Sequence, residues 1–400
     1  MTTIEHPNDV QIEFMKNPEF SPTVKKSIDN IIKNEGYIKH TKYERQISTN
    51  GGNYLGDLFE VDIRGKTSDG DKETNLFIKR IITSEGLTIL STQDIQNREI
   101  LAYCELNRIC TELMDEANIP NSERFRQAKC YDANSEVMIL ENLTVKGFKT
   151  TDRTEALTLE FAESAIKQLA KFHGLSFAIQ NKRPAYFDTN LKTLKSPFIF
   201  SSHLDKVFSD LFNKGCELLD EKEAKRITEA FEQIFDLKNH YEKDQRCLCH
   251  GDYRTNNMLI QIEEGAIVDL VPVDFQLIYY GNPVNDFMYF LIAHSDQEFR
   301  RLHMNTLKEL YYKHLGEFLQ YFDIKLEEVY PRRVFDSDFK NRLIFGLMSS
   351  ICLLTFLFAK EDATPDLADM ESMDNKVQLQ DGAKDRIRGI VDDYINWGVI

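Results

Sequence analysis

The chain has 400 residues and a formal net charge of -16, from 65 acidic and 49 basic residues. Its length allows two parts that each bury a core, and a content of 42% apolar and 28% charged residues is ordinary for a folded soluble protein. Because so acidic a surface repels nucleic acids and anionic membranes, we expect neither as a partner, and we expect local features to hold any bound nucleotide.

The first residues that suggest an element are Val24, Ile28, Ile31 and Ile32, whose spacing predicts a helix. Alternating apolar and polar residues predict a strand over 54–63, and a second strand follows at 75–82. A helical period returns over 93–117, and two short strands are predicted within 129–140. The first part of the chain is therefore predicted to be a β-rich lobe, residues 1–141, that includes one long helix.

After residue 141 the pattern becomes helical over 157–179, 204–241 and 286–400, with a short β region at 247–275. We expect a mainly helical second lobe over 142–400 and a ligand site at the interface of the two lobes. The segment 343–359 carries no charge, but it is shorter than the roughly 20 residues of a spanning helix. It is predicted to be a buried core helix, without stable insertion in a membrane.

The seven cysteines are scattered along the chain and show no spacing typical of a zinc site. Together with a polar amino-terminus that lacks the pattern of a signal peptide, they favour reduced thiols in a cytoplasmic protein.

The strongest functional pattern is the segment 248–276, LCHGDYRTNNMLIQIEEGAIVDLVPVDFQ. Asp252 precedes Asn257 by five residues, and a hairpin over 258–273 is expected to return Asp274 to the neighbourhood of Asn257. Phosphoryl transfer requires an aligned hydroxyl, an acceptor for its proton and a divalent metal, and magnesium prefers carboxylate and amide oxygens. Asp and Asn are also common in loops, but the combined spacing is restrictive and favours a phosphotransferase.

This segment resembles the catalytic and metal-binding segments of choline and aminoglycoside kinases, and most closely those of the ecdysteroid-kinase-like proteins of insects. The resemblance implies an α+β, two-lobe protein-kinase-like fold with a β-rich, nucleotide-binding first lobe and a mainly helical, catalytic second lobe. It also implies that Asp252 is the catalytic base, that Asn257 and Asp274 hold Mg, and that His250 braces the loop. Many relatives have Leu-Trp where this chain has Tyr253-Arg254, positions that we expect to face the acceptor.

A glycine-rich segment, Gly51-Gly52-Asn53-Tyr54-Leu55-Gly56, is predicted to cover the phosphates of ATP with backbone N–H groups. A simple hairpin turn explains the glycines equally well. The segment resembles the family loop in its Asn-Tyr pair, with Gly52 and Gly56 in place of a glutamate and a serine.

Lys79 lies in an apolar strand, where a buried ammonium group needs a partner, and Glu99 on the following helix is the expected one. Arg80 is an alternative to the lysine. Asp94 and Glu105 are alternatives to Glu99.

Further matches to the family are Glu141, which stands where the family offers backbone groups to adenine, and Asp286, which is expected to brace the catalytic loop. His173 is interpreted as a packed helix residue.

These features predict an ATP- and Mg-dependent kinase whose substrate is a small alcohol, with no protein partner inferred. The resemblance points to an ecdysteroid or a related steroid or xenobiotic alcohol. The alternatives are a choline- or aminoglycoside-type kinase with a cationic acceptor, and a catalytically inactive nucleotide-binding protein.

Overall fold

The computed structural model describes residues 20–47, 56–81, 89–151, 155, 157–234, 236–359, 379–380 and 382–400. The chain forms two compact units. The sheet unit contains the described residues before position 84 together with Ala128–Lys146, and the helical unit contains Ser84–Gln127 and Gly147–Ile400.

The sheet unit is built on five antiparallel strands in the order β1-β2-β3-β5-β4. Its elements are α1 (Pro22–Asn34), β1 (Lys39–Ile47), β2 (Gly56–Thr67), β3 (Gly70–Ile81), β4 (Cys130–Ala133) and β5 (Val137–Glu141).

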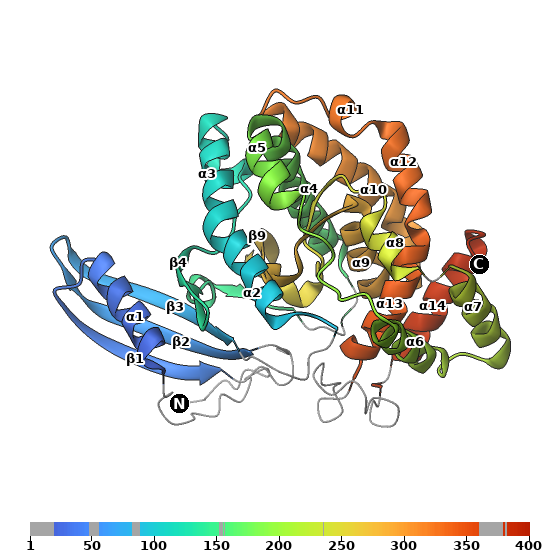
Figure 1. Cartoon of the computed structure of the whole chain (residues 1–400), viewed down its shortest axis with the longest axis horizontal. Coiled ribbons are helices and arrows are strands. Elements are labelled where there is room, and N and C mark those ends of the chain that lie inside the picture. The colour runs from blue at the N-terminus through green and yellow to red at the C-terminus, as the bar shows by residue number, and fades with distance from the viewer. Residues whose placement is uncertain are drawn as a thin grey trace. The chain divides into compact units, whose positions relative to one another are not determined.

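One face of this sheet is buried by α1 (Figure 1). The helix begins at the N-cap Ser21, whose hydroxyl accepts a hydrogen bond from the backbone N–H of Val24 at 3.2 Å, and Pro22 provides a first helical residue that needs no N–H partner. The apolar residues of α1 that recur at helical spacing are buried against alternate residues of the central strands. The core of this unit is formed by Phe20, Val24, Ile28, Ile31, Ile32, Phe59, Val61, Ile63, Leu76, Ile78, Val137 and Ile139.

The helical unit begins with a long helix in three consecutive segments, α2 (Thr92–Ile100), a π-helical segment (Leu101–Leu106) and α3 (Asn107–Glu116). Its larger helices are α4 (Leu159–Lys182), α6 (Ser202–Cys216), α7 (Glu221–Ile234), α9 (Pro283–His294), α10 (Gln297–Gln320), α12 (Arg332–Asn341), α13 (Leu343–Leu357) and α14 (Ala383–Asn396). The short helices are α5 (Pro184–Tyr186), α8 (Leu237–Glu242) and α11 (Leu326–Val329).

Two small sheets complete the helical unit. One pairs β7 (Cys247–Cys249) with β10 (Tyr279–Gly281), and the other has β6 (Phe148–Lys149), β8 (Met258–Glu263) and β9 (Ala266–Pro272) in the order β6-β8-β9. Both sheets pack against α4, β7 directly and the other through β9, and α10 packs along the same helix. The segment 250–257 therefore connects two short sheets that share one supporting helix.

Helix α13 corresponds to the uncharged segment noted in the sequence, and the prediction of a buried core helix is confirmed. It packs against α6, α9 and α14, with most of its side chains buried. Among the described residues, no single helix is long and apolar enough to cross a membrane. The helices α12 and α13 reach the length and apolar content of a membrane-spanning segment only when they are taken together, and the chain bends by 45° between them.

The predicted division into a β-rich first part and a mainly helical second part is confirmed. The segment Ser84–Gln127, however, packs with the helical unit although the strands β4 and β5 that follow it return to the sheet. Sequence order cannot reveal this, because the pairing of β5 with β3 spans the helix between them. Strand β1 was also not predicted, and it forms the edge of the sheet with largely exposed side chains.

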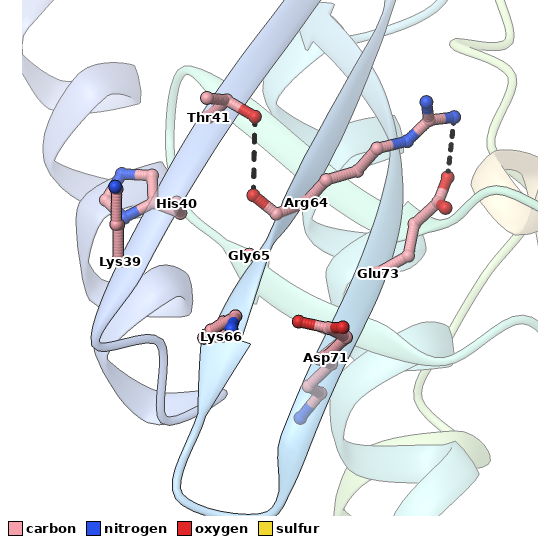
Figure 2. Close-up of a pocket in the computed structure, with 9 residues that line it drawn as sticks. Lys39, His40, Thr41, Arg64, Gly65, Lys66, Asp71 and Glu73 are labelled. Atoms are coloured by element: carbon pink, nitrogen blue, oxygen red, sulfur yellow. Dashed lines mark hydrogen bonds and ion pairs between the residues drawn. The ribbon is translucent and has the colours of Figure 1, made fainter.

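A shallow hollow lies on the sheet unit, where β1 and the β2–β3 hairpin meet (Figure 2). Gly65 permits the close approach of the strands here, since an added Cβ would lie 2.0 Å from the carbonyl oxygen of Lys39. Around it, Thr41 donates to the carbonyl of Arg64 at 3.4 Å, and the Arg64 guanidinium pairs with Glu73 at 3.0 Å. None of the predicted site residues lines this hollow.

Candidate active site

The predicted catalytic loop follows β7 directly. Strand β7 is fully buried and pairs antiparallel with β10, so that Cys249 lies opposite Tyr279. The loop then turns through Gly251, whose φ of 80° lies in the left-handed region, and ends in a short 3-10 turn, Thr255–Asn257, before β8 begins. A backbone hydrogen bond from Asn257 N–H to the carbonyl of Arg254 closes that turn at 2.9 Å.

Asp252 lies at the centre of the loop, and its side chain is 8% exposed. Its Oδ2 accepts a hydrogen bond from Nδ2 of Asn257 at 2.8 Å and lies 3.2 Å from Nε of Arg254. Its Oδ1 accepts a hydrogen bond from the hydroxyl of Tyr289, on α9, at 2.7 Å. A nearly buried carboxylate held by several donors is a fixed acceptor for a proton, the arrangement that a general base requires.

The hairpin β8–β9 returns the chain to Asn257, as predicted. Met258 pairs with Pro272, and the N–H of Val273 donates to the carbonyl of Asn257 at 2.9 Å, so that the residue before Asp274 is fixed to Asn257. The Nδ2 group of Asn257 also donates to the backbone carbonyl of Asp252 at 3.0 Å. Because both of these contacts use the amide nitrogen, Oδ1 of Asn257 is the atom available to a metal ion, and it is the hard oxygen ligand that magnesium prefers.

Asp274 adopts a left-handed backbone conformation with φ of 67°, which is uncommon for a residue with a side chain. Two neighbours hold it there: its N–H donates to the hydroxyl of Tyr103 at 3.1 Å, and Nε2 of Gln276 donates to its Oδ2 at 3.3 Å. Tyr103 comes from the π-helical segment and packs edge-on against Phe275, with ring centroids 5.4 Å apart. A strained residue over-determined by its surroundings is typical of functional sites.

His250 connects the loop to the end of β9. Its Nε2 lies 3.2 Å from the carbonyl oxygen of Val273, and its Nδ1 lies 3.3 Å from the backbone N–H of Asp252. Burial lowers the pKa of His250, so the ring is neutral, with the proton on Nε2 to donate to the carbonyl and a lone pair on Nδ1 to accept. These contacts agree with the interpretation of His250 as a brace of the loop.

Asp286, on α9, supports the same loop from the other side. Its Oδ2 accepts from the backbone N–H of His250 at 2.6 Å, and its Oδ1 accepts from the N–H of Gly251 at 2.9 Å. Oδ2 also lies 3.1 Å from Nε2 of His173, whose Nδ1 lies 2.7 Å from the hydroxyl of Tyr311. The pairing of α4, α9 and α10 with the loop through these side chains supports the expectation that Asp286 is a brace and His173 a packed helix residue.

The remaining predicted residues are distributed over both units. Lys79 lies on β3 of the sheet unit and is 8% exposed, whereas Glu99 lies on α2 of the helical unit and is 4% exposed. The ion pair between them stays a prediction. Two of the alternative residues form ion pairs within their own units. Arg80, the alternative to Lys79, pairs with Asp57, and Asp94, an alternative to Glu99, pairs with Arg98 at 2.8 Å.

Glu141 ends β5, where its N–H donates to the carbonyl of Lys129 at 2.8 Å and its carboxylate pairs with Lys146. Its predicted contact with adenine is not tested by these bonds. Gly51, Gly52 and Asn53 lie outside the described residues.

Of the two loop positions expected to face the acceptor, the expectation for Tyr253 is wrong. Its side chain is 1% exposed and its hydroxyl donates to the carbonyl of Ala165 in α4 at 2.6 Å, because the apolar ring fills the core beneath the loop. Arg254, by contrast, lies beside Asp252. Tyr289 was not predicted as a site residue, since only its spacing of three residues from Asp286 on α9 indicates that both face the loop.

The side chains of His173, Cys247 and Cys249 also converge, with possible ligand atoms within 4.8 Å of one another. Both ring nitrogens of His173 are already engaged, and burial raises the pKa of both thiols, so the thiolates that a soft metal requires are disfavoured. We interpret this cluster as part of the core.

A model of the ecdysteroid kinase-like family matches residues 50–324, more than half of the chain and the whole of the loop, hairpin and α9 described above. The chain belongs to the ecdysteroid kinase-like family. The predicted family, the kinase-like α+β fold with a sheet unit and a helical unit, and the enzyme class of a small-molecule phosphotransferase are thereby confirmed.

Solved structures similar to this family member include a putative aminoglycoside phosphotransferase from Ralstonia eutropha JMP134, with 12% identity over 82% of this chain and 96% of that chain and a TM-score of 0.41. Another is the GDP complex of wild-type aminoglycoside 2'-phosphotransferase-IIIa, with 12% identity over 93% of this chain and 99% of that chain, also with a TM-score of 0.41. No curated protein gives a match.

Proposed function

We propose that this ecdysteroid kinase-like protein transfers the γ-phosphoryl group of ATP, with Mg, to a hydroxyl group of a small neutral molecule such as an ecdysteroid or a related steroid or xenobiotic alcohol. The observation that carries the proposal is the carboxylate of Asp252, which is nearly buried and held by Asn257 and Tyr289 on a loop that Asp286 fixes to α9. The seven cysteines are free thiols, in keeping with a cytoplasmic location for this activity.

In the proposed reaction, Asp252 accepts the proton of the substrate hydroxyl while the substrate oxygen forms a bond to the γ-phosphorus and the bond to the departing ADP breaks. The oxygens of Asn257 and Asp274 are the proposed ligands of Mg, which supplies charge neutralisation at the phosphates when bound. Lys79, paired with Glu99, and the backbone of Gly51, Gly52 and Asn53 are proposed to hold the phosphates, and Glu141 to contact adenine.

The position of Arg254 favours a neutral acceptor over a cationic one. Its Nε lies 3.2 Å from Oδ2 of Asp252, and its side chain is 13% exposed, so a positive charge is already present next to the base in a weakly screened environment. A quaternary ammonium or an aminoglycoside amine at the same carboxylate would be repelled by the guanidinium. We therefore place the choline- or aminoglycoside-type kinase second.

The experiment that tests the proposal incubates the purified full chain with ATP, Mg and a panel of acceptors, and detects the mass gain of one phosphate. The panel contains an ecdysteroid, a plain steroid alcohol, choline and an aminoglycoside. We expect transfer to a neutral alcohol and a loss of at least about 100-fold in kcat for Asp252→Asn, the range for removal of a general base. Chelation of Mg should abolish turnover, and Asp274→Asn should raise the Mg concentration that is needed.

Asp269→Asn is the matched control, because Asp269 lies on β9 and pairs with Arg126 at 2.8 Å, away from the loop. It removes the same charge from the adjoining β8–β9 hairpin and should leave kcat unchanged. Equal turnover by Asp252→Asn and the wild type on every acceptor would refute the assigned base. Faster transfer to choline than to any neutral alcohol would refute the acceptor class alone.

A further inference from the structure

Helix α9 presents two side chains to the catalytic loop from consecutive turns. Asp286 and Tyr289 are three residues apart and therefore share one face of the helix. Asp286 binds the loop backbone, through the N–H groups of His250 and Gly251, and Tyr289 binds the side chain of Asp252. Every other residue of α9 is buried, whereas Tyr289 is partly exposed. Tyr289 is thus the point at which this core helix reaches the accessible side of the carboxylate.

The two oxygens of Asp252 are not equivalent. Oδ2 accepts a hydrogen bond from the Asn257 amide at 2.8 Å, and the guanidinium of Arg254 lies against it, with Nε 3.2 Å away, as an ion pair. Oδ1 accepts a hydrogen bond only from Tyr289 among the described residues. Because a carboxylate oxygen can accept two hydrogen bonds, one lone pair of Oδ1 is open to a further donor.

The phenol of Tyr289 is suited to remain a donor. Burial, with the nearby charge of Asp252 as a second cause, raises the pKa of Tyr289 well above its usual value, so the hydroxyl keeps its proton at neutral pH. Its aromatic ring has two side-chain torsions and is anchored on a buried helix, which makes the position of the hydroxyl well defined.

We propose that Tyr289 is a positioning residue: its hydroxyl fixes the carboxylate of Asp252 so that the open lone pair of Oδ1 is directed at the hydroxyl group of the acceptor. This inference rests on the proposed function, in which Asp252 is the base. The acceptor then binds next to the Tyr289 ring, so this part of its binding site is aromatic. Alignment of the reacting hydroxyl with its base is a large source of rate enhancement, and a freely rotating carboxylate would lose part of it.

The test is Tyr289→Phe in the full chain, which removes the phenol oxygen and keeps the ring. We expect kcat to fall about 10-fold or more, with KM for ATP changed less than about twofold, since one charge-assisted hydrogen bond at the base is lost. KM for the acceptor should change by a similarly small factor, so the loss falls on kcat. A residue with a structural role only would not give this split between kcat and KM at an unchanged unfolding midpoint.

Tyr330→Phe is the matched control. The Tyr330 hydroxyl donates to Oδ2 of the buried Asp338 at 3.0 Å, which is the same kind of bond between α12 and the segment before it. This variant should lose a similar amount of stability and keep the kcat of the wild type. Since Tyr289 is partly exposed and Phe keeps its ring, we expect Tyr289→Phe to fold, with an unfolding midpoint close to that of the control.

The outcomes separate the two proposals. If the wild type shows no phosphoryl transfer that depends on Asp252, the proposed function is refuted. If the wild type is active and Tyr289→Phe has the same kcat, the positioning role is refuted while the function stands. A fall in kcat that Tyr330→Phe matches also refutes the positioning role, because such a fall reflects a loss of stability.

Discussion

Replacement of Asp286 by Asn should show how much the hydrogen bonds between Asp286 and the catalytic loop contribute to stability and to kcat. The carboxylate is 2% exposed and accepts three hydrogen bonds, from the backbone of His250 at 2.6 Å, from the backbone of Gly251 at 2.9 Å and from the ring of His173 at 3.1 Å. An asparagine of the same shape has one acceptor oxygen, so its NH₂ group must face at least one of these donors.

The expected loss can be worked from these bonds. At least one charge-assisted hydrogen bond disappears, worth about 1.5–3 kcal/mol, and the opposing buried N–H stays unsatisfied at a further cost of about 1–3 kcal/mol. We expect the free energy of unfolding of Asp286→Asn to fall by about 2.5–6 kcal/mol. Since the donors belong to the residues directly before Asp252, kcat should fall as well, by at least about tenfold.

The assay is denaturant unfolding of both proteins together with kcat for the best acceptor. Asp336→Asn is the control: Asp336 lies on α12 and pairs with Arg332 at 2.9 Å and with Lys308 at 2.5 Å. The side chains of Arg332 and Asp336 are 38% and 42% exposed, and that of Lys308 is 17% exposed. Pairs at the surface contribute at most about 1 kcal/mol each. If Asp286→Asn is no less stable than Asp336→Asn and keeps its kcat, the brace is not needed and the reasoning is wrong.

Two further predictions concern the loop glycine and a buried histidine. An alanine Cβ at Gly251 would lie 2.2 Å from the carbonyl oxygen of Leu277, whereas at Gly265, which has a similar positive φ, it would meet nothing within 4 Å. In denaturant unfolding, Gly265→Ala should lower the free energy of unfolding only by the left-handed backbone strain of about 1–2 kcal/mol. Gly251→Ala should lower it by at least about 2 kcal/mol more and should also reduce kcat. Equal losses of stability in the two variants would contradict the predicted clash. Burial lowers the pKa of His294 to about 3, so the folded state binds fewer protons than the unfolded state below about pH 6.5, and stability is lost as the pH falls. We expect His294 to account for about 2 kcal/mol of the stability that is lost between about pH 7.5 and about pH 5. His294→Asn keeps a hydrogen-bond donor but does not titrate, so its free energy of unfolding should depend less on pH by this amount. The same pH dependence in both proteins would rule out His294 as the cause.

Much of the fold was predictable because it follows from local patterns. The apolar residues of α1 recur at helical spacing. The β8–β9 hairpin consists of two strand-like segments joined by a Glu-Gly turn, in which Glu264 and Gly265 both have positive φ. The interpretation of 343–359 as a core helix was confirmed for the same reason, since length and apolar content are properties of the segment itself.

Contacts between distant segments could not be predicted in this way. The placement of Ser84–Gln127 with the helical unit depends on which surface buries the most apolar area, and this is a property of the assembled chain. The same holds for the direction of the Tyr253 side chain. It depends on the carbonyl of Ala165 in α4, which accepts the hydrogen bond of the Tyr253 hydroxyl and is distant in the sequence.

The sequence by itself indicated the chemistry that we propose for segment 248–276. It places an acidic residue, an amide and a second acidic residue at spacings that suit phosphoryl transfer, and these residue types and the hairpin are encoded locally. Only the tertiary structure decided how Asp252 is held. Tyr289 lies 37 residues after Asp252, and no period connects a loop residue to a helix residue at that separation. The hydrogen bond exists because α9 packs beneath the loop, and it is this packing that leaves one lone pair of the carboxylate open and gives it a direction.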